Sequence, residues 1–212
     1  MKRTLQIGSL FAIIMLIACG NENNYIVATD FSLLIPDSTQ ISNGITIDQQ
    51  QKRSEEFIMT VRENTLNHEI PDAIVFDLNG KSHNLKDQLS NVSLIISASL
   101  TCAWNLTGLL NDFPKANQLI AKPITKKEIV LLILKENNDY FKLQFDENIK
   151  DIKSNYSNIF LIDSIQSSKL NILAFSRYYI SRAQVVLDFE IGTTLSYESL
   201  IIELKRNTNA NK

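Results

Sequence analysis

Cys102 is one of two cysteines in this 212-residue chain, and it lies where a predicted strand gives way to a predicted helix. The apolar run 92–97 precedes it, and a helical pattern begins at Ala103. A helix start presents unpaired backbone N–H groups and the positive end of the helix macrodipole. This setting favours the thiolate, which is the nucleophilic form of cysteine. The sequence therefore predicts Cys102 as a candidate nucleophile.

The residues that follow Cys102 depart from a two-cysteine arrangement. In a C-x-x-C dithiol the second cysteine would stand at position 105, where this chain has Asn105. Trp104 is predicted to form part of an exposed recognition surface, and the alternative is that it packs on the preceding loop. Asn105 could bond the thiolate or be an ordinary polar residue of a first helical turn. Cys102 itself could instead be a small buried apolar residue.

The other cysteine, Cys19, ends an N-terminal targeting pattern. Lys2 and Arg3 precede an apolar run at 7–18 that is too short to span a bilayer. Residues 16–19 resemble the end of a bacterial lipoprotein signal. The resemblance implies cleavage before Cys19, diacylglycerol on its sulfur and acylation of its new amine, for example with palmitate. The alternatives are an ordinary secretory signal or an uncleaved anchor.

A lipid on Cys19 would tether the protein to a bacterial membrane and leave Cys102 without an intrachain partner. We expect a location in the cell envelope, facing the periplasm or the exterior. The outer membrane is favoured over the inner one, because Gly20 and Asn21 do not resemble an inner-membrane retention signal.

Composition excludes several classes of function. The chain has 21 basic and 23 acidic residues and no Lys/Arg stripe with interleaved aromatics, so no nucleic-acid partner is expected. The two histidines, His68 and His83, have no spaced ligand cluster around them, so both are expected at the surface and no metal is predicted. No glycine-rich phosphate loop occurs, and no cofactor is predicted.

The pattern along the chain predicts an α/β fold with a mixed central sheet. Strands are predicted at residues 73–78, 81–85, 92–97, 128–134, 158–162 and 183–189, with helices at 103–120, 139–152, 164–175 and 197–205. Asn79-Gly80 predicts a hairpin between the first two strands. The predicted organisation is a signal peptide at 1–18, a lipid-anchored tether that could hold short strands at 19–47, an N-terminal helix at 48–69, the main domain at 70–206, and a polar tail at 207–212.

Two stretches of the chain resemble the thioredoxin-like superfamily, in particular its membrane-anchored thiol–disulfide oxidoreductases and the related peroxiredoxins. Residues 71–81 match a Pro-Asp-strand-Asp-x-x-Gly-Lys segment, and residues 94–102 match a buried strand, an Ala/Ser-rich turn and the cysteine. The resemblance covers about 71–205. It implies a three-layer sandwich with helices on both faces of the sheet and Cys102 at the active position.

The chain departs from that family at three positions. Asn105 replaces the resolving cysteine, and Leu100-Thr101 replaces the aromatic that commonly precedes the motif. The family's cis-proline is expected just before a strand, and we assign its position to Ala183. A non-proline cis bond costs about 3–4 kcal/mol, so a trans bond and a remodelled site are expected there.

A peroxiredoxin site is matched at one position of three. Ser99 fits the hydroxyl three residues before the cysteine, whereas Ile95 occupies the proline position. Arg177 and Arg182 are candidates for the distant arginine, with nothing in the sequence to place either.

These observations predict a lipid-anchored thioredoxin-like protein that is at most a single-cysteine thiol–disulfide exchange protein. Its partner would be a protein that carries a thiol or a disulfide. The alternative is a catalytically inactive thioredoxin-fold interaction module at the cell envelope. A one-cysteine peroxiredoxin is a third, less favoured interpretation.

Overall fold

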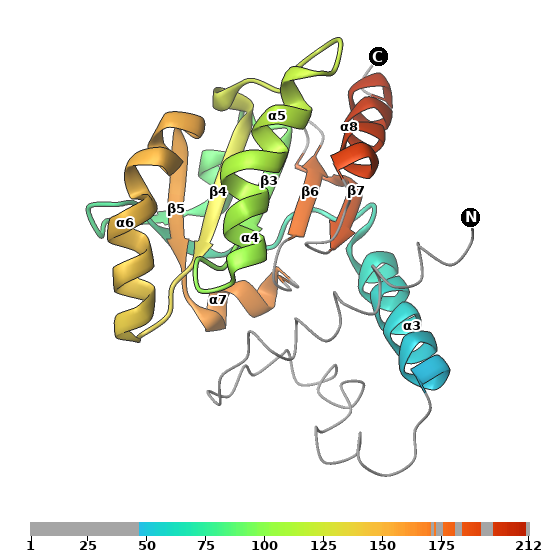
Figure 1. Cartoon of the computed structure of the whole chain (residues 1–212), viewed down its shortest axis with the longest axis horizontal. Helices are drawn as coiled ribbons and strands as arrows, with labels where there is room; N and C mark the ends of the chain where they lie inside the picture. The colour runs from blue at the N-terminus through green and yellow to red at the C-terminus, as the bar shows by residue number, and fades with distance from the viewer. Residues whose placement is uncertain (1–46, 171, 173–175, 181–183, 192–196, 211–212) are drawn as a thin grey trace.

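A seven-stranded mixed sheet forms the centre of the protein in a computed structural model, which describes residues 47–170, 172, 176–180, 184–191 and 197–210 (Figure 1). The strand order is β2-β1-β5-β4-β3-β6-β7. The predicted α/β class is therefore confirmed. The signal peptide, the tether with Cys19, and Ala183 lie outside the described residues.

Three parallel strands make the middle of the sheet, because their apolar runs are buried on both faces. β3 pairs in parallel with β4, and β4 pairs in parallel with β5. The antiparallel pair β6–β7 extends the sheet beyond β3, and the β1–β2 hairpin extends it beyond β5. The strands are β1 (Ile74–Phe76), β2 (Ser82–Asn84), β3 (Leu94–Ala98), β4 (Ile129–Leu134), β5 (Asn158–Ile162), β6 (Ser176–Ile180) and β7 (Val186–Ile191).

The hairpin prediction at Asn79-Gly80 is confirmed. Gly80 has a φ of 82°, a left-handed conformation that glycine adopts without a steric penalty. Its N–H donates to the Asp77 carbonyl at 2.9 Å, which closes the turn between β1 and β2.

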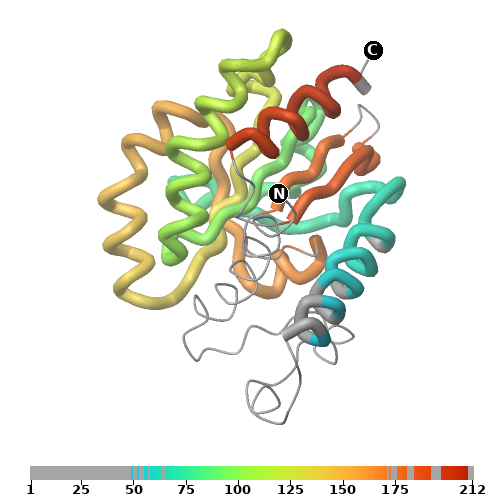
Figure 2. The backbone as a smooth tube through the Cα atoms, turned by 45° about the vertical axis from the view of Figure 1, so that its right-hand side comes forward, coloured from blue at the N-terminus to red at the C-terminus, as the bar shows by residue number. Residues whose placement is uncertain are grey.

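Helices cover both faces of the sheet, as a three-layer sandwich requires (Figures 1 and 2). One core cluster joins one face of the central strands to α4, α5, α6 and α8, and the other joins the opposite face to α3, η1 and the end of α7. The helical segments are α3 (Ile47–Thr65), η1 (Leu85–Gln88), α4 (Ala103–Thr107), η2 (Gly108–Asp112), α5 (Phe113–Gln118), η3 (Lys126–Glu128), α6 (Asp139–Asn155), α7 (Ser164–Lys169) and α8 (Tyr197–Ala210).

α4, η2 and α5 form one helical run with a wide turn in the middle. Pro114 has no N–H to donate into the preceding turn, so a regular α-helix cannot continue through it undisturbed. The π-helical turn η2 lies directly before it, and the Phe113 N–H donates to the Gly108 carbonyl. The π-helical turn lets the helical run continue past Pro114.

α3 is attached to the edge strand β7 by main-chain and side-chain contacts. Val61 is fully buried in the second core cluster. Arg62 forms ion pairs with Asp188 and Glu190 of β7. After the helix, the Asn67 N–H donates to the Val186 carbonyl at 2.9 Å.

One strand was missed, and three predicted elements need correction. β6 was not predicted at all, and the helix expected at 164–175 is described only as α7, which ends at Lys169. The last strand begins at Val186 instead of residue 183. α8 continues to Ala210 and buries Asn207, so residues 207–210 are helical where a polar tail was expected.

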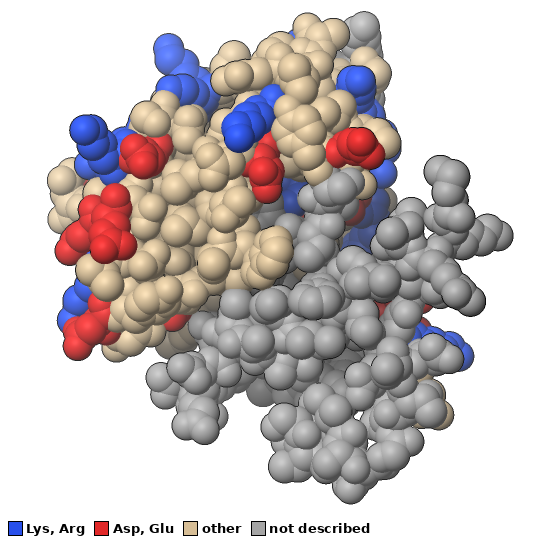
Figure 3. Space-filling view, viewed as in Figure 1, with Lys and Arg blue, Asp and Glu red and all other residues tan. Residues whose placement is uncertain are grey.

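On the face shown in Figure 3, basic and acidic side chains lie near one another around an uncharged centre. None of the helices in the described ranges is both long and apolar enough to cross a bilayer.

Candidate functional site

Cys102 lies at the junction of β3 and α4, where the sequence placed it. Its backbone is extended, with φ −99° and ψ 112°, and it precedes the first residue of α4. Its carbonyl accepts the first helical bond from the Leu106 N–H at 3.0 Å. Only 6% of the residue is exposed, and it forms no disulfide with the rest of the described chain. The thiol is therefore at a helix start but shielded from solvent.

The edge of the sheet that holds Cys102 is the one where all three parallel strands end. β3, β4 and β5 run in the same direction, so the segments after Ala98, Leu134 and Ile162 meet there. Loops at the carboxyl ends of parallel strands are the usual position of ligand and catalytic sites in open α/β sheets. The starts of α4, α6 and α7 gather at this edge, at the lower end of the sheet in Figure 1.

Glu136, just after β4, is a site residue that sequence reasoning missed. Its Oε1 accepts hydrogen bonds from the Ser99 hydroxyl at 2.9 Å and the Thr101 hydroxyl at 2.6 Å. Its Oε2 accepts from Asn138 Nδ2 at 3.0 Å. The carboxylate therefore ties the loop before Cys102 to the start of α6. The one feature of the sequence that could have indicated Glu136 is its position shortly after the predicted buried strand 128–134, which is β4.

Asn105 is almost fully buried, at 1% exposure, one turn after Cys102. Its Oδ1 is the one buried side-chain polar atom without a hydrogen-bond partner in the described part of the chain. An unsatisfied buried polar group costs about 1–3 kcal/mol. Asn105 is thus not an ordinary solvated polar residue of a first turn. Trp104, in contrast, is 50% exposed beside the shielded thiol.

Ala183, the position assigned to the family's cis-proline, lies outside the described residues, so the assignment stays a prediction. The two ends of β6 lie at different ends of β3. The Ile180 N–H donates to the Ser93 carbonyl, before β3, whereas Ser176 pairs with Ser97 near the end that leads to Cys102. The Ser176 end of β6 is therefore the end on the Cys102 side of the sheet. No proline follows Pro123 in the sequence.

Arg177, one of the two candidate arginines of the peroxiredoxin interpretation, forms its hydrogen bonds with Glu203 of α8. Arg177 is fully buried in β6 and forms two bonds with Glu203 of α8, both at 2.7 Å. Burial lowers the pKa of Arg177, but the charge of Glu203 and its hydrogen bonds raise it, and the net pKa is above the ordinary value. Ser99, the matching hydroxyl, is bonded to Glu136. Arg182 lies outside the described residues.

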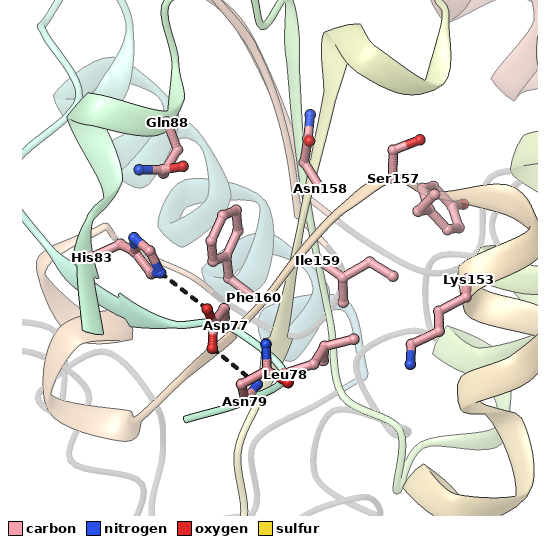
Figure 4. Close-up of a pocket in the computed structure, with 11 residues that line it drawn as sticks. Asp77, Leu78, Asn79, His83, Gln88, Lys153, Ser157, Asn158, Ile159 and Phe160 are labelled. Carbon is pink, nitrogen blue, oxygen red and sulfur yellow. Dashed lines mark hydrogen bonds and ion pairs between the residues drawn. The ribbon is translucent and has the colours of Figure 1, made fainter. Parts of the chain in front are cut away.

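A hollow lies at the end of the sheet opposite Cys102, between the β1–β2 turn, the start of β5 and the end of α6 (Figure 4). It has a volume of about 550 Å³. The His83 ring contacts Asp77 Oδ2 at 3.2 Å and packs edge-on against Phe160, so His83 is partly buried where a surface position was expected. Backbone bonding from Lys81 and the His83 contact lower the pKa of Asp77. His68 is exposed, as predicted.

No protein-family model matches the sequence, and no curated protein matches it. Among solved structures, the thioredoxin domain of a thiol-disulfide oxidoreductase from Bacteroides vulgatus is 15% identical with a TM-score of 0.47, over 66% of this chain and 96% of that chain. A thiol:disulfide interchange protein from Bacteroides sp. is 14% identical with a TM-score of 0.47, over 68% and 90%. The exposed lipoprotein thioredoxin of Streptococcus pneumoniae is 12% identical with a TM-score of 0.42, over 64% and 99%.

Likenesses at 12–15% identity and TM-scores of 0.42–0.47 assign neither a family nor a function to this chain. Within the molecule itself, a parallel β3–helix–β4 unit is followed by the antiparallel pair β6–β7 and a final helix, with Cys102 after β3. The chain has a thioredoxin-like α/β fold, as its sequence resemblance implied.

Proposed function

We propose that this protein is a single-cysteine thiol–disulfide exchange protein of the cell envelope. The observation that carries the proposal is the position of Cys102, at a helix start and at the carboxyl edge of the central parallel strands. A half-exposed Trp104 beside it offers apolar contact area to a partner protein. Asn105 in place of a second cysteine limits the chemistry to one thiol.

The proposed reaction has two steps. The Cys102 thiolate attacks one sulfur of a partner disulfide, forms a mixed disulfide and releases the other sulfur as a thiolate. An external thiol, after losing its proton, then attacks the mixed disulfide at the partner's sulfur. This second step forms a new disulfide between the partner and the external thiol and regenerates the Cys102 thiolate. Overall, two electrons pass from the external thiol, which ends in the new disulfide, to the partner sulfur that was released as a thiolate, and no other reductant is needed.

The test is reaction of the folded protein with glutathione disulfide. We expect one glutathione to add to the peptide that contains Cys102 without denaturant, and a later addition of dithiothreitol to remove it. The measurement is the mass of that peptide, and Cys102→Ser is the control that should gain no mass. Addition only after unfolding in urea would contradict the proposal.

The burial of Cys102 favours a second candidate, a non-catalytic interaction module. A thiol that is 6% exposed is shielded from partners in the described conformation. In this case the exposed surface around Trp104 would bind a partner protein without exchange of a sulfur bond. Substitution of Trp104 by alanine would then weaken binding, and Cys102→Ser would leave it unchanged.

We further propose that Cys19 anchors the protein through lipid, on the basis of residues 16–19 and the basic, apolar segment before them. A multiply acylated cysteine gives stable anchoring, whereas a single chain would be marginal. We place the anchored protein in the outer membrane in preference to the inner one.

Replacing Cys19 by serine is expected to abolish metabolic labelling with a fatty acid such as palmitate and to release the protein from the membrane fraction. Cys102→Ser is the matched control and should keep the label. If Cys19→Ser still incorporated the fatty acid, the lipoprotein interpretation would be wrong.

A further inference from the structure

The loop between β3 and Cys102 is held from two sides. Leu100, in its middle, is 1% exposed and lies in the core cluster under α4 and α5. Ser99 and Thr101, on either side of it, both direct their hydroxyls to Glu136 Oε1. The two hydroxyl oxygens are also 2.8 Å from each other. One carboxylate oxygen therefore fixes both residues that flank Leu100, and Thr101 is bonded directly to Cys102.

Glu136 is itself held in place by the start of α6. Asn138 donates its Nδ2 to Glu136 Oε2 at 3.0 Å, and its Oδ1 accepts the Phe141 N–H at 2.6 Å as the cap of α6. An Asn cap of this kind fixes the first turn of a helix. A continuous path of hydrogen bonds thus runs from α6 through Glu136 to the residue before Cys102.

We propose that Glu136 is a positioning residue for Cys102: its carboxylate clamps Ser99 and Thr101 and so keeps the thiol in its shielded place until a partner or a local opening releases it. This inference rests on the proposed exchange function for its purpose. Bonds to an ionised carboxylate are roughly twice as strong as neutral ones, so the clamp is a strong local restraint. Because it acts on one loop, its loss should open that loop without unfolding the sheet.

The test measures alkylation of Cys102 by iodoacetamide in the folded protein, read as mass on the peptide that contains Cys102. Glu136→Ala is expected to increase the labelling rate about tenfold or more, because both charge-assisted bonds to the loop are lost. The paired change Ser99→Ala with Thr101→Val removes the same bonds from the other side. It should give a similar increase, and adding Glu136→Ala to it should change the rate little.

Asp77→Ala is the matched control. Asp77 is also a partly exposed loop carboxylate with three contacts, from the Asn79 and Lys81 N–H groups and the His83 ring, but it lies at the opposite end of the sheet. We expect it to change the labelling rate less than about twofold, since it is remote from the loop. Equal acceleration in this control would show a general loss of stability and overturn the proposal. So would an unchanged rate in Glu136→Ala.

Two further measurements distinguish a failure of the positioning role of Glu136 from a folding defect and from a failure of the proposed exchange function. If Glu136→Ala does not fold, the Ser99→Ala and Thr101→Val pair decides alone, because it retains the carboxylate. Incubation of the opened variant with glutathione disulfide tests the exchange function. Fast alkylation without a mixed disulfide would refute the exchange function and leave the role of Glu136 intact.

Discussion

Asn105→Cys is expected to give this protein a C-x-x-C dithiol that closes to a disulfide under mild oxidant. Cys102 precedes α4 and position 105 lies in its first turn, so the two side chains occupy neighbouring places on one helix face. The substitution also removes the buried Oδ1 that has no partner, so the new side chain should be accommodated well. We expect insulin reduction with dithiothreitol to rise about tenfold or more over the native protein, since an internal thiol now resolves the mixed disulfide.

Thr107→Cys provides the control for this prediction. Thr107 is exposed on the same helix but stands five residues after Cys102, on a different side of it. It should form no intramolecular disulfide and give no added turnover. The readouts are free thiols after oxidation and insulin turbidity. If Asn105→Cys kept both thiols free after mild oxidation, Cys102 would not lie at the start of α4.

Loss of the Glu203 side chain is expected to lower the free energy of unfolding of the domain by about 3–5 kcal/mol. Glu203 accepts two bonds from Arg177 and one from the Tyr179 hydroxyl at 2.6 Å, and all three side chains are buried. Burial and the Glu203 charge together raise the pKa of Tyr179 well above its ordinary value, so its hydroxyl stays a donor. Glu203→Ala leaves a buried guanidinium without its counter-charge, which costs about 3–5 kcal/mol.

Urea unfolding followed by circular dichroism measures this effect. Glu198→Ala is the matched control on the same helix, where the side chain is exposed, and it should change stability by less than about 0.5 kcal/mol. Replacing all three partners with apolar residues, as in Arg177→Met, Tyr179→Phe and Glu203→Leu, should recover most of the loss. Similar midpoints for Glu203→Ala and Glu198→Ala would contradict the buried ion pair.

The sequence by itself determined most of the element order and the position of Cys102. The apolar runs of β3, β4 and β5 match strands buried on both faces, and such runs are read from composition without knowledge of neighbours. The hairpin at Asn79-Gly80 is equally local, because the left-handed conformation of Gly80 is a property of one residue. The change from strand to helix at Cys102 followed from periodicity alone.

Only the tertiary structure shows that residues 176–180 form the strand β6 and that Arg177 is buried in it. The segment Ser-Arg-Tyr-Tyr-Ile has polar residues at its start, and Arg177 is buried there only because Glu203, on the last helix, neutralises it. A local pattern cannot show a partner so distant in sequence. The antiparallel pairing of β6 with β3, which brings the Ser176 end of β6 to the Cys102 side of the sheet, was equally hidden from the local pattern.

The same limit applies to the candidate site. Glu136 meets Ser99 and Thr101 because β3 and β4 are parallel neighbours, which brings residues 35 and 37 positions apart into contact. The burial of Cys102 and Asn105 also follows from how the helical run packs on the sheet, since both residue types occur at exposed and buried helix starts. Sequence alone thus predicted Cys102 as a candidate nucleophile, whereas packing decided how far that residue is shielded and which side chain bonds the loop before it.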